Sequence, residues 1–216
     1  MSTGIISSRS ATELNIKPSI HNRLHAHQNA IVHPEIKLAE VLFITSFPPR
    51  ECGIATYSKD LIDALNNKFD KSFNCSICAL ESSNEQHEYL SQPKFILNTD
   101  QPNAFEKTAV EINKDDAIKL IVIQHEFGFY ASKETAFKLF YESINKPIVF
   151  VFHTVLPKPN EALRINVQNM ARFASSVIVM TNDAANILKV DYNIASTKIS
   201  VIPHGTHLVP PIEKNH

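Results

Sequence analysis

Short, continuous apolar runs alternate along most of this chain with longer segments in which apolar residues recur at helical spacing. The runs occupy residues 41–46, 74–80, 94–98, 118–124, 147–152, 176–181 and 198–203. Runs of this length that are rich in Val and Ile are typical of strands covered on both faces, and such burial is typical of parallel sheets. The pattern therefore predicts a parallel sheet buried by helices.

The amphipathic segments lie between these runs. The first carries Ile54, Tyr57, Leu61 and Leu65 on one helical face. Further helices are predicted at residues 105–114, 132–145, 160–173 and 183–190. The alternation predicts an α/β fold, a doubly wound, mostly parallel Rossmann-like sheet with helices on both faces. Right-handed crossovers then place the carboxyl ends of all strands at one edge of the sheet, where ligands bind.

The first 37 residues differ from the rest of the chain. They are polar and show neither helical nor strand periodicity, which predicts a loose leader over residues 1–37. Its histidines, His21, His25, His27 and His33, could bind a metal, but no apolar scaffold fixes their geometry, so we interpret them as solvated. The remaining length suits one domain, over residues 38–208.

Charge and cysteine content narrow the class of protein. The 21 Lys and Arg nearly balance the 22 Asp and Glu, so no basic field favours nucleic acid as a partner. The N-terminus lacks the pattern of a signal peptide, and no apolar run approaches the roughly 18 residues of a membrane span, which predicts a cytoplasmic protein. Three cysteines suit a reducing compartment. Cys75 and Cys78 have CxxC spacing, but their position in an apolar run favours buried strand thiols over redox or metal sites.

The predicted strands end in chemically similar motifs: TSFPPRECG, QHEFG, FHT, MTN and PHG. Three of the four glycines and three histidines thereby gather at one edge of the sheet. Pro48 and Pro49 end the first strand, and Gly53 permits a tight turn and a close approach to a ligand before the helix begins. A helix N-terminus is a ready site for phosphate or carboxylate, although any strand–turn–helix unit can carry a glycine without such a role.

Several kinds of site are disfavoured by the motifs. The sequence has no GxxxxGK[ST] loop, no GxGxxG fingerprint and no GxSxG elbow. His125, Glu126, His153 and His204 could suggest metal-assisted hydrolysis, but no HExxH motif accompanies them. His125 and Glu126 are adjacent, so on an extended backbone only one of them can enter the cleft. Neutral imidazoles here could bond a sugar hydroxyl, act as a base or bind metal.

Five ordered motifs, SFPPRECGIATYSKDL, QHEFG, VFHTVLPKP, VIVMTNDAANIL and KISVIPHG, resemble the N-terminal half of a GT-B glycosyltransferase of the retaining family 4 type. The resemblance runs from about Val41 to about Gly205. It implies two Rossmann-like domains that face each other, with the acceptor held mostly by the first and the nucleotide-sugar by the second. It also implies sugar transfer to an acceptor hydroxyl with retention of configuration, and no required metal or other cofactor.

The resemblance also implies roles for individual residues. His153 and Glu126 match catalytic positions, His153 through contact with the transferred sugar. Gly53, Cys52, His125 and Thr154 match the residues that bind the donor phosphates and sugar, and His125 with Glu126 also lines the acceptor side. Pro203, His204 and Gly205 match the hinge into the second domain.

This sequence departs from the family pattern in two ways. Members usually carry two adjacent glycines in the first loop, where this chain has Cys52 and Gly53. The chain also ends at His216, just beyond the hinge, so residues 209–216 are expected to be a tail leading to an absent C-terminal domain. The ExxxxxxxE motif belongs to that domain, and we interpret the same spacing at Glu126, Glu134 and Glu142 as coincidence.

Two functions from different classes remain open at this point. One is the acceptor-side half of a glycosyltransferase, inactive without a C-terminal domain supplied in cis or in trans. Its partners would be a nucleotide-sugar donor and a sugar, polysaccharide or lipid acceptor, and nucleic acid is not expected. It would act in the cytoplasm, including at the inner face of the membrane. The other is a non-catalytic module that binds a sugar, an anion or a protein. A homodimer is possible in either case.

Overall fold

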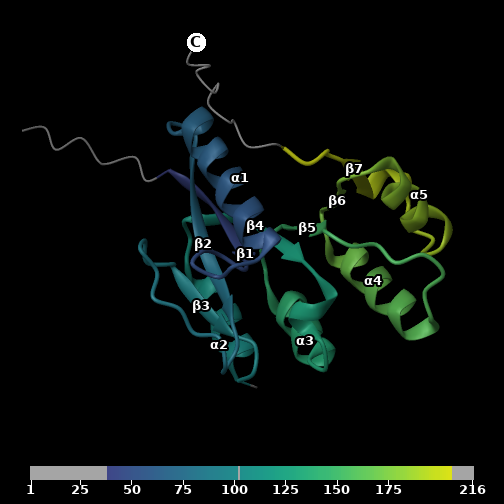
Figure 1. The fold of residues 1–216 in the computed structure, drawn as a ribbon, viewed down its shortest axis with the longest axis horizontal. Helices are drawn as coiled ribbons and strands as arrows, with labels where there is room; N and C mark the ends of the chain where they lie inside the picture. Colours follow the sequence, from purple (N-terminus) through teal and green to yellow (C-terminus); the bar gives the residue numbers. More distant parts are fainter. Residues whose placement is uncertain (1–37, 102, 206–216) are drawn as a thin grey trace, which may run out of the picture. The chain divides into compact units, whose positions relative to one another are not determined.

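The computed structural model describes residues 38–101 and 103–205, which contain a seven-stranded sheet (Figure 1). The strands are β1 (Ala39–Thr45), β2 (Phe73–Glu81), β3 (Phe95–Asn98), β4 (Ile118–His125), β5 (Ile148–Phe152), β6 (Ser176–Val179) and β7 (Ile199–Val201). Their order is β3-β2-β1-β4-β5-β6-β7, and every neighbouring pair is parallel. The chain order reverses direction next to β1, so the crevice between the ends of β1 and β4 is the topological switch point where such folds bind ligands.

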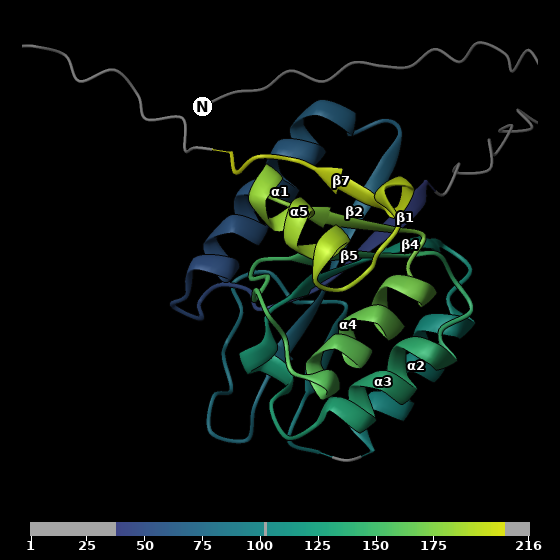
Figure 2. The same ribbon diagram turned by 90° about the vertical axis from the view of Figure 1, so that its right-hand side faces the viewer.

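Helices cover the sheet on both faces. They are α1 (Gly53–Phe69), α2 (Ala104–Lys114), α3 (Glu134–Ser143), α4 (Glu161–Phe173) and α5 (Asn182–Val190), with the 3₁₀ turns η1 (Phe127–Tyr130) and η2 (Ser196–Lys198). Figure 2 shows α2, α3 and α4 in a row on one side, with α1 on the other. The predicted doubly wound, Rossmann-like α/β fold is confirmed.

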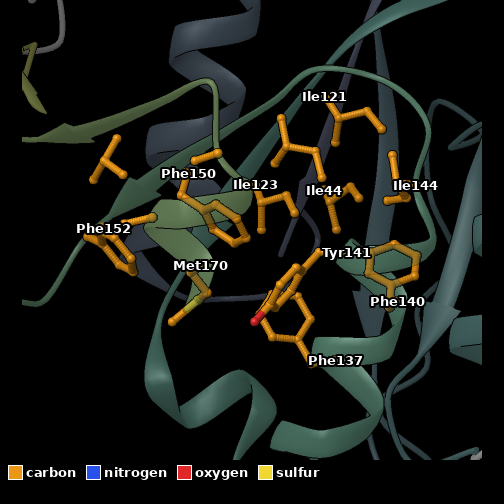
Figure 3. Close-up of a cluster of buried hydrophobic side chains, with 14 of the residues drawn as sticks. Ile44, Ile121, Ile123, Phe137, Phe140, Tyr141, Ile144, Phe150, Phe152 and Met170 are labelled. Atoms are coloured by element: carbon orange, nitrogen blue, oxygen red, sulfur yellow. The ribbon is translucent and has the colours of Figure 1, made fainter. Parts of the chain in front are cut away.

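The main core lies between the sheet and the row of helices. Ile121 and Ile123 of β4, with Phe150 and Phe152 of β5, face side chains of α3 and α4 (Figure 3). Those helices contribute Phe137, Phe140, Tyr141 and Met170. Burying one such side chain is worth about 1.5–3 kcal/mol, so this layer fixes the row of helices to the sheet.

The packing between α1 and the opposite face of the sheet is partly polar. Ala55 and Ile62 of α1 are buried, and Ser58 shares a hydrogen bond of 2.6 Å with Thr45 at the end of β1. Alternation along the strands puts Val122 and Gln124 on this same face, because Val122 pairs with Phe43 across the sheet. The polar ends of β1 and β4 therefore point toward the N-terminal half of α1.

Some boundaries differ from the sequence prediction for local reasons. The run 176–181 was expected to be one strand, but Thr181 caps α5 by accepting a hydrogen bond from the Ala184 amide at 3.1 Å. The helix expected from residue 132 begins at Glu134, because Ser132 has a positive φ of 64°. The predicted leader with its histidines, and residues 209–216, lie outside the described residues and remain predictions.

The described part of the chain carries free cysteines and no membrane span. Cys75 and Cys78 lie unpaired on β2, where burial raises the pKa of their thiols to about 11 and about 12. Both therefore hold their protons at neutral pH, as structural thiols do. No helix within residues 38–101 and 103–205 combines the length and apolar character that crossing a membrane would require.

Candidate functional site

Side chains from three separate segments meet at the carboxyl edge of the sheet. Tyr57 comes from the second turn of α1, His153 directly follows β5, and His204 follows β7. The Tyr57 ring packs edge-on against both imidazoles, with centroid distances of 5.1 Å to His153 and 4.9 Å to His204. The two imidazole centroids lie 6.1 Å apart. The predicted convergence of His153 and His204 on one rim is therefore present.

A buried glutamine orients His153. Nε2 of His153 lies 2.7 Å from Oε1 of Gln124, whose side chain is fully buried. A carboxamide oxygen only accepts, so in this arrangement Nε2 of His153 donates and Nδ1 keeps its lone pair. Gln124 thus fixes both the tautomer and the ring orientation of the histidine.

His153 is neutral at physiological pH. Burial is the main cause that lowers its pKa to about 4; the nearby His204 lowers it further, and Glu126 acts in the opposite direction. A neutral imidazole offers one donor and one acceptor in place of a fixed positive charge. Since Nε2 is bonded to Gln124, Nδ1 is the nitrogen that can accept a hydrogen bond from a hydroxyl group.

Glu126 joins the ends of β4 and β5. One carboxylate oxygen accepts a hydrogen bond of 2.6 Å from Oγ1 of Thr154, and the other accepts one of 3.0 Å from the Phe127 amide. The backbone amide of His153 also donates to the carbonyl of His125 at 3.1 Å. These bonds hold the first residues after β5 against the first residues after β4, so His153 sits on a braced loop.

The N-terminus of α1 lies at the same edge. Cys52 is the N-cap, and its Sγ accepts from the Ala55 amide at 3.4 Å and lies 3.2 Å from Oγ of Ser46. The first turn of α1 has no acidic residue. A Cβ added at Gly53 would meet no atom within 4 Å. Local packing therefore does not require a glycine here, and its backbone is open to a ligand.

Gly53 differs from the sequence expectation in one respect. It does not adopt a positive φ and is the first residue of the helix, so the turn itself needs no glycine. Of the two reasons given for a glycine here, close approach of a ligand is the one that the geometry supports.

His125 lies apart from this group. Its ring is 2% exposed and points to the α3 side, where the rings of Phe127, Phe152 and Tyr130 lie at centroid distances of 4.9, 5.1 and 5.7 Å. Burial, with a smaller effect from His153, lowers its pKa to about 3. The side chain therefore does not face the space beside Gly53 that a donor phosphate would occupy. The expectation that only one of His125 and Glu126 enters the cleft agrees with this geometry.

The remaining predicted site residues have less structural context. Pro203, His204 and Gly205 are exposed at the end of the described segment, and their hinge role remains a prediction. The described residues contain no group of three or more His, Cys, Asp or Glu placed to hold a metal ion.

Two residues of the site were missed in the sequence. Tyr57 was assigned only to the apolar face of its helix, yet it stands one turn after Gly53 and so shares the rim. Gln124 was treated as part of an apolar strand, although a glutamine at the end of such a run must find a partner once it is buried. The need of Gln124 for a hydrogen-bond partner was therefore predictable from the sequence.

Comparison with known protein families assigns most of this chain to one family. The model of Glycosyltransferase Family 4 matches residues 53–209, more than half of the chain. A glycosyltransferase from Rickettsia africae ESF-5 has a similar structure, with a TM-score of 0.52 and 15% identity, over 77% of this chain and 43% of its own. An α-glucosyltransferase in complex with UDP and a 13-mer DNA containing a HMU base gives a TM-score of 0.50 and 10% identity, over 78% and 43%. No curated protein matches the sequence.

These two likenesses, both at low identity, concern the fold, and this chain spans less than half the length of either structure. The family model, in contrast, covers Gly53 and the three segments that carry Tyr57, His153 and His204. The chain belongs to glycosyltransferase family 4 and carries the Rossmann-like N-terminal domain that its motifs resemble.

Proposed function

We propose that this chain is the acceptor-side half of a glycosyltransferase that moves a sugar from a nucleotide-sugar to an acceptor hydroxyl with retention. The observation that carries the proposal is the cluster of Tyr57, His153 and His204 beside the open backbone of Gly53, in a chain of family 4. A second domain, in cis or in trans, would bind the nucleotide and close the cleft.

The α1 N-terminus suits the diphosphate of the donor. Its positive dipole end favours an anion, no acidic side chain in the first turn opposes one, and the absence of a Cβ at Gly53 lets phosphate oxygens approach the backbone. UDP is present in one of the structures with a similar fold, which is consistent with a nucleoside diphosphate donor. As the resemblance implies, we expect transfer without a metal ion or other cofactor.

His153 is the residue that we assign to the transferred sugar. Held by Gln124 and uncharged, it presents a hydrogen-bonding nitrogen whose direction is fixed before the substrate arrives. Such preorganised groups accelerate reactions when they bind the transition state better than the ground state. Both oxygens of Glu126 bond within the protein, so we assign it to positioning the His153–Thr154 loop, where the family resemblance implied a catalytic role.

The test requires the chain joined to its second domain. His153→Ala should lower kcat by about 100-fold, the scale expected for removing one preorganised hydrogen-bonding group, with a smaller change in the KM for the nucleotide-sugar. Lys107→Ala, an exposed substitution on α2 at the opposite face, is the matched control and should leave kcat unchanged. Full activity of the His153 variant would refute the assignment.

A second measurement separates transfer from simple binding. The isolated 216-residue chain should show no sugar transfer from a nucleotide-sugar, because the proposal assigns nucleotide binding to a second domain. Sustained turnover by the isolated chain would contradict the proposed division of labour. If the joined protein bound sugars without any turnover, the non-catalytic binding module would be the correct function.

A further inference from the structure

A second site lies on the other side of the sheet, between η1, α3 and α4. It is a cavity of about 440 Å³. Its apolar lining includes Phe127, Tyr130, Phe137, Tyr141, Leu163 and Met170. Three of these, Phe137, Tyr141 and Met170, are drawn in Figure 3. The volume and the mainly apolar lining are those of small-molecule sites, which commonly span about 300–1,000 Å³.

Two residues that line this cavity each carry a buried polar atom without a hydrogen-bond partner in the described part of the chain. These atoms are Nδ1 of His125 and the hydroxyl of Tyr130. Both residues are 2% exposed, and their rings are stacked with centroids 5.7 Å apart. Buried polar atoms in native proteins nearly always have a hydrogen-bond partner. Two unmatched groups on residues that line the same cavity are therefore candidate hydrogen-bond partners for a molecule bound there.

The charges around the cavity limit what that molecule can be. Burial keeps His125 neutral and raises the pKa of Tyr130, so neither group offers a charge. Of the charged residues in the lining, Lys138 pairs with Glu142, and the carboxylate of Glu134 accepts a hydrogen bond from the Ser132 amide. The site therefore suits a neutral, apolar ligand with a hydroxyl.

We propose that this cavity binds an apolar ring bearing a hydroxyl group, with the hydroxyl bonded to His125 and Tyr130. Tyr130 stacks on Phe137 with ring centroids 3.6 Å apart, so the lining contains a stacked aromatic pair, and another ring can pack against its edges. A hydroxyl can donate and accept at once, and it therefore satisfies an imidazole nitrogen and a phenol together.

The ligand's origin follows from the loops that border the cavity. Leu156 lines it and lies two residues after Thr154, and Phe127 lines it directly after Glu126. The same loops therefore border the cavity and carry the hydrogen bond that braces His153. We assign the bound ring to the non-sugar part of the acceptor, an assignment that rests on the proposed function, whereas the binding site itself does not.

Direct binding to the 216-residue chain tests the site. The probe is 4-(trifluoromethyl)phenol, followed by ¹⁹F NMR, and the comparison is 4-methylbenzotrifluoride, which has the same shape without a hydroxyl. The phenol should bind saturably and at least about tenfold more tightly than the methyl analogue, because the analogue leaves both polar groups unpaired. Equal affinities, or no saturation by the phenol, would overturn the proposal.

Variants locate the binding. Ala162→Phe places a ring into the cavity from an exposed position on α4 and should abolish binding. Ile165→Phe, exposed on the same helix but not lining the cavity, should bind as the parent chain does. Tyr130→Phe should reduce the preference for the phenol. Unchanged binding in Ala162→Phe would show that the probe binds elsewhere, and circular dichroism and thermal unfolding confirm that each variant is folded.

The acceptor assignment has its own readout in the two-domain protein. The phenol should inhibit transfer competitively against the acceptor and not against the donor. Binding without inhibition would refute the acceptor assignment. Binding to a two-domain protein that transfers no sugar would refute the proposed function and leave the cavity site in place.

Discussion

The buried imidazole of His125 makes the stability of this domain depend on pH in a predictable way. In the unfolded chain its pKa is near 6.5, whereas in the folded protein burial holds the pKa at about 3. Between these values the unfolded state binds more protons, so acid favours unfolding. The contribution of His125 to the free energy of unfolding is therefore fully present above pH 6.5, the pKa in the unfolded chain, and it is lost progressively as the pH decreases from about 6.5 toward 3.

The two pKa values set the size of the effect. At pH 5 the unfolded histidine is protonated about 30 to 1 and the folded one is essentially neutral, which lowers the free energy of unfolding by about 2 kcal/mol relative to pH 8. His153, whose pKa is lowered to about 4, contributes in the same direction, but its partial exposure makes its share smaller.

Urea unfolding at pH 8 and pH 5 measures this pH dependence of the free energy of unfolding, and His125→Phe is the substitution that tests its cause. Phe suits the aromatic surroundings and does not titrate. Between pH 8 and pH 5 the free energy of unfolding of the variant should therefore fall by about 2 kcal/mol less than that of the parent chain. His153→Ala is the second comparison and should remove a smaller part of the pH dependence. If His125→Phe keeps the parent's full pH dependence, the reasoning about burial is wrong.

Three further substitutions test the carboxyl edge of the sheet. Gly53→Ala should leave the midpoint of thermal unfolding unchanged or slightly higher, because the added Cβ meets no atom. The same substitution should raise the KM for the nucleotide-sugar in the two-domain protein. An unchanged KM would refute the close approach of a phosphate to Gly53. Cys52→Ala should destabilise the chain by about 1 kcal/mol in urea unfolding by removing the cap of α1, and Cys52→Ser should restore it; equal stability would show that the sulfur does not cap. Thr154→Val should lower the free energy of unfolding by about 1.5–3 kcal/mol, because it removes the hydrogen bond to Glu126. Thr154→Ser keeps the hydroxyl and should not lower it. A small loss for Thr154→Val would show that the hydrogen bond is weak.

The fold was predictable because its signals are local and repeated. Each apolar run from 41–46 to 198–203 contains most of one observed strand, and the amphipathic segments between them became the helices. The errors occurred where one residue ends an element, as at Thr181 and Ser132. Capping and positive φ depend on single backbone conformations, which hydrophobic periodicity does not report.

The candidate site was predictable only in part, because convergence of strand ends follows from topology but side-chain direction follows from register. The parallel sheet brings Gly53, His153 and His204 to one edge whatever their surroundings. The partners of these residues depend on how β4 and β5 align. That alignment places Gln124 beside His153, and nothing in the order of the residues states it.

The alternation of β4 gives its two last residues different chemistry. Gln124 points toward α1, where it orients the neutral His153, and His125 points toward α3, where it is a polar member of an aromatic cavity lining. A one-residue shift of register would exchange the two side chains and disable both sites. If both proposals hold, the pairing of His125 with Phe152 is a functional constraint as well as a structural one, because it keeps the proposed sugar-binding rim and the apolar cavity on opposite faces of the same strand end.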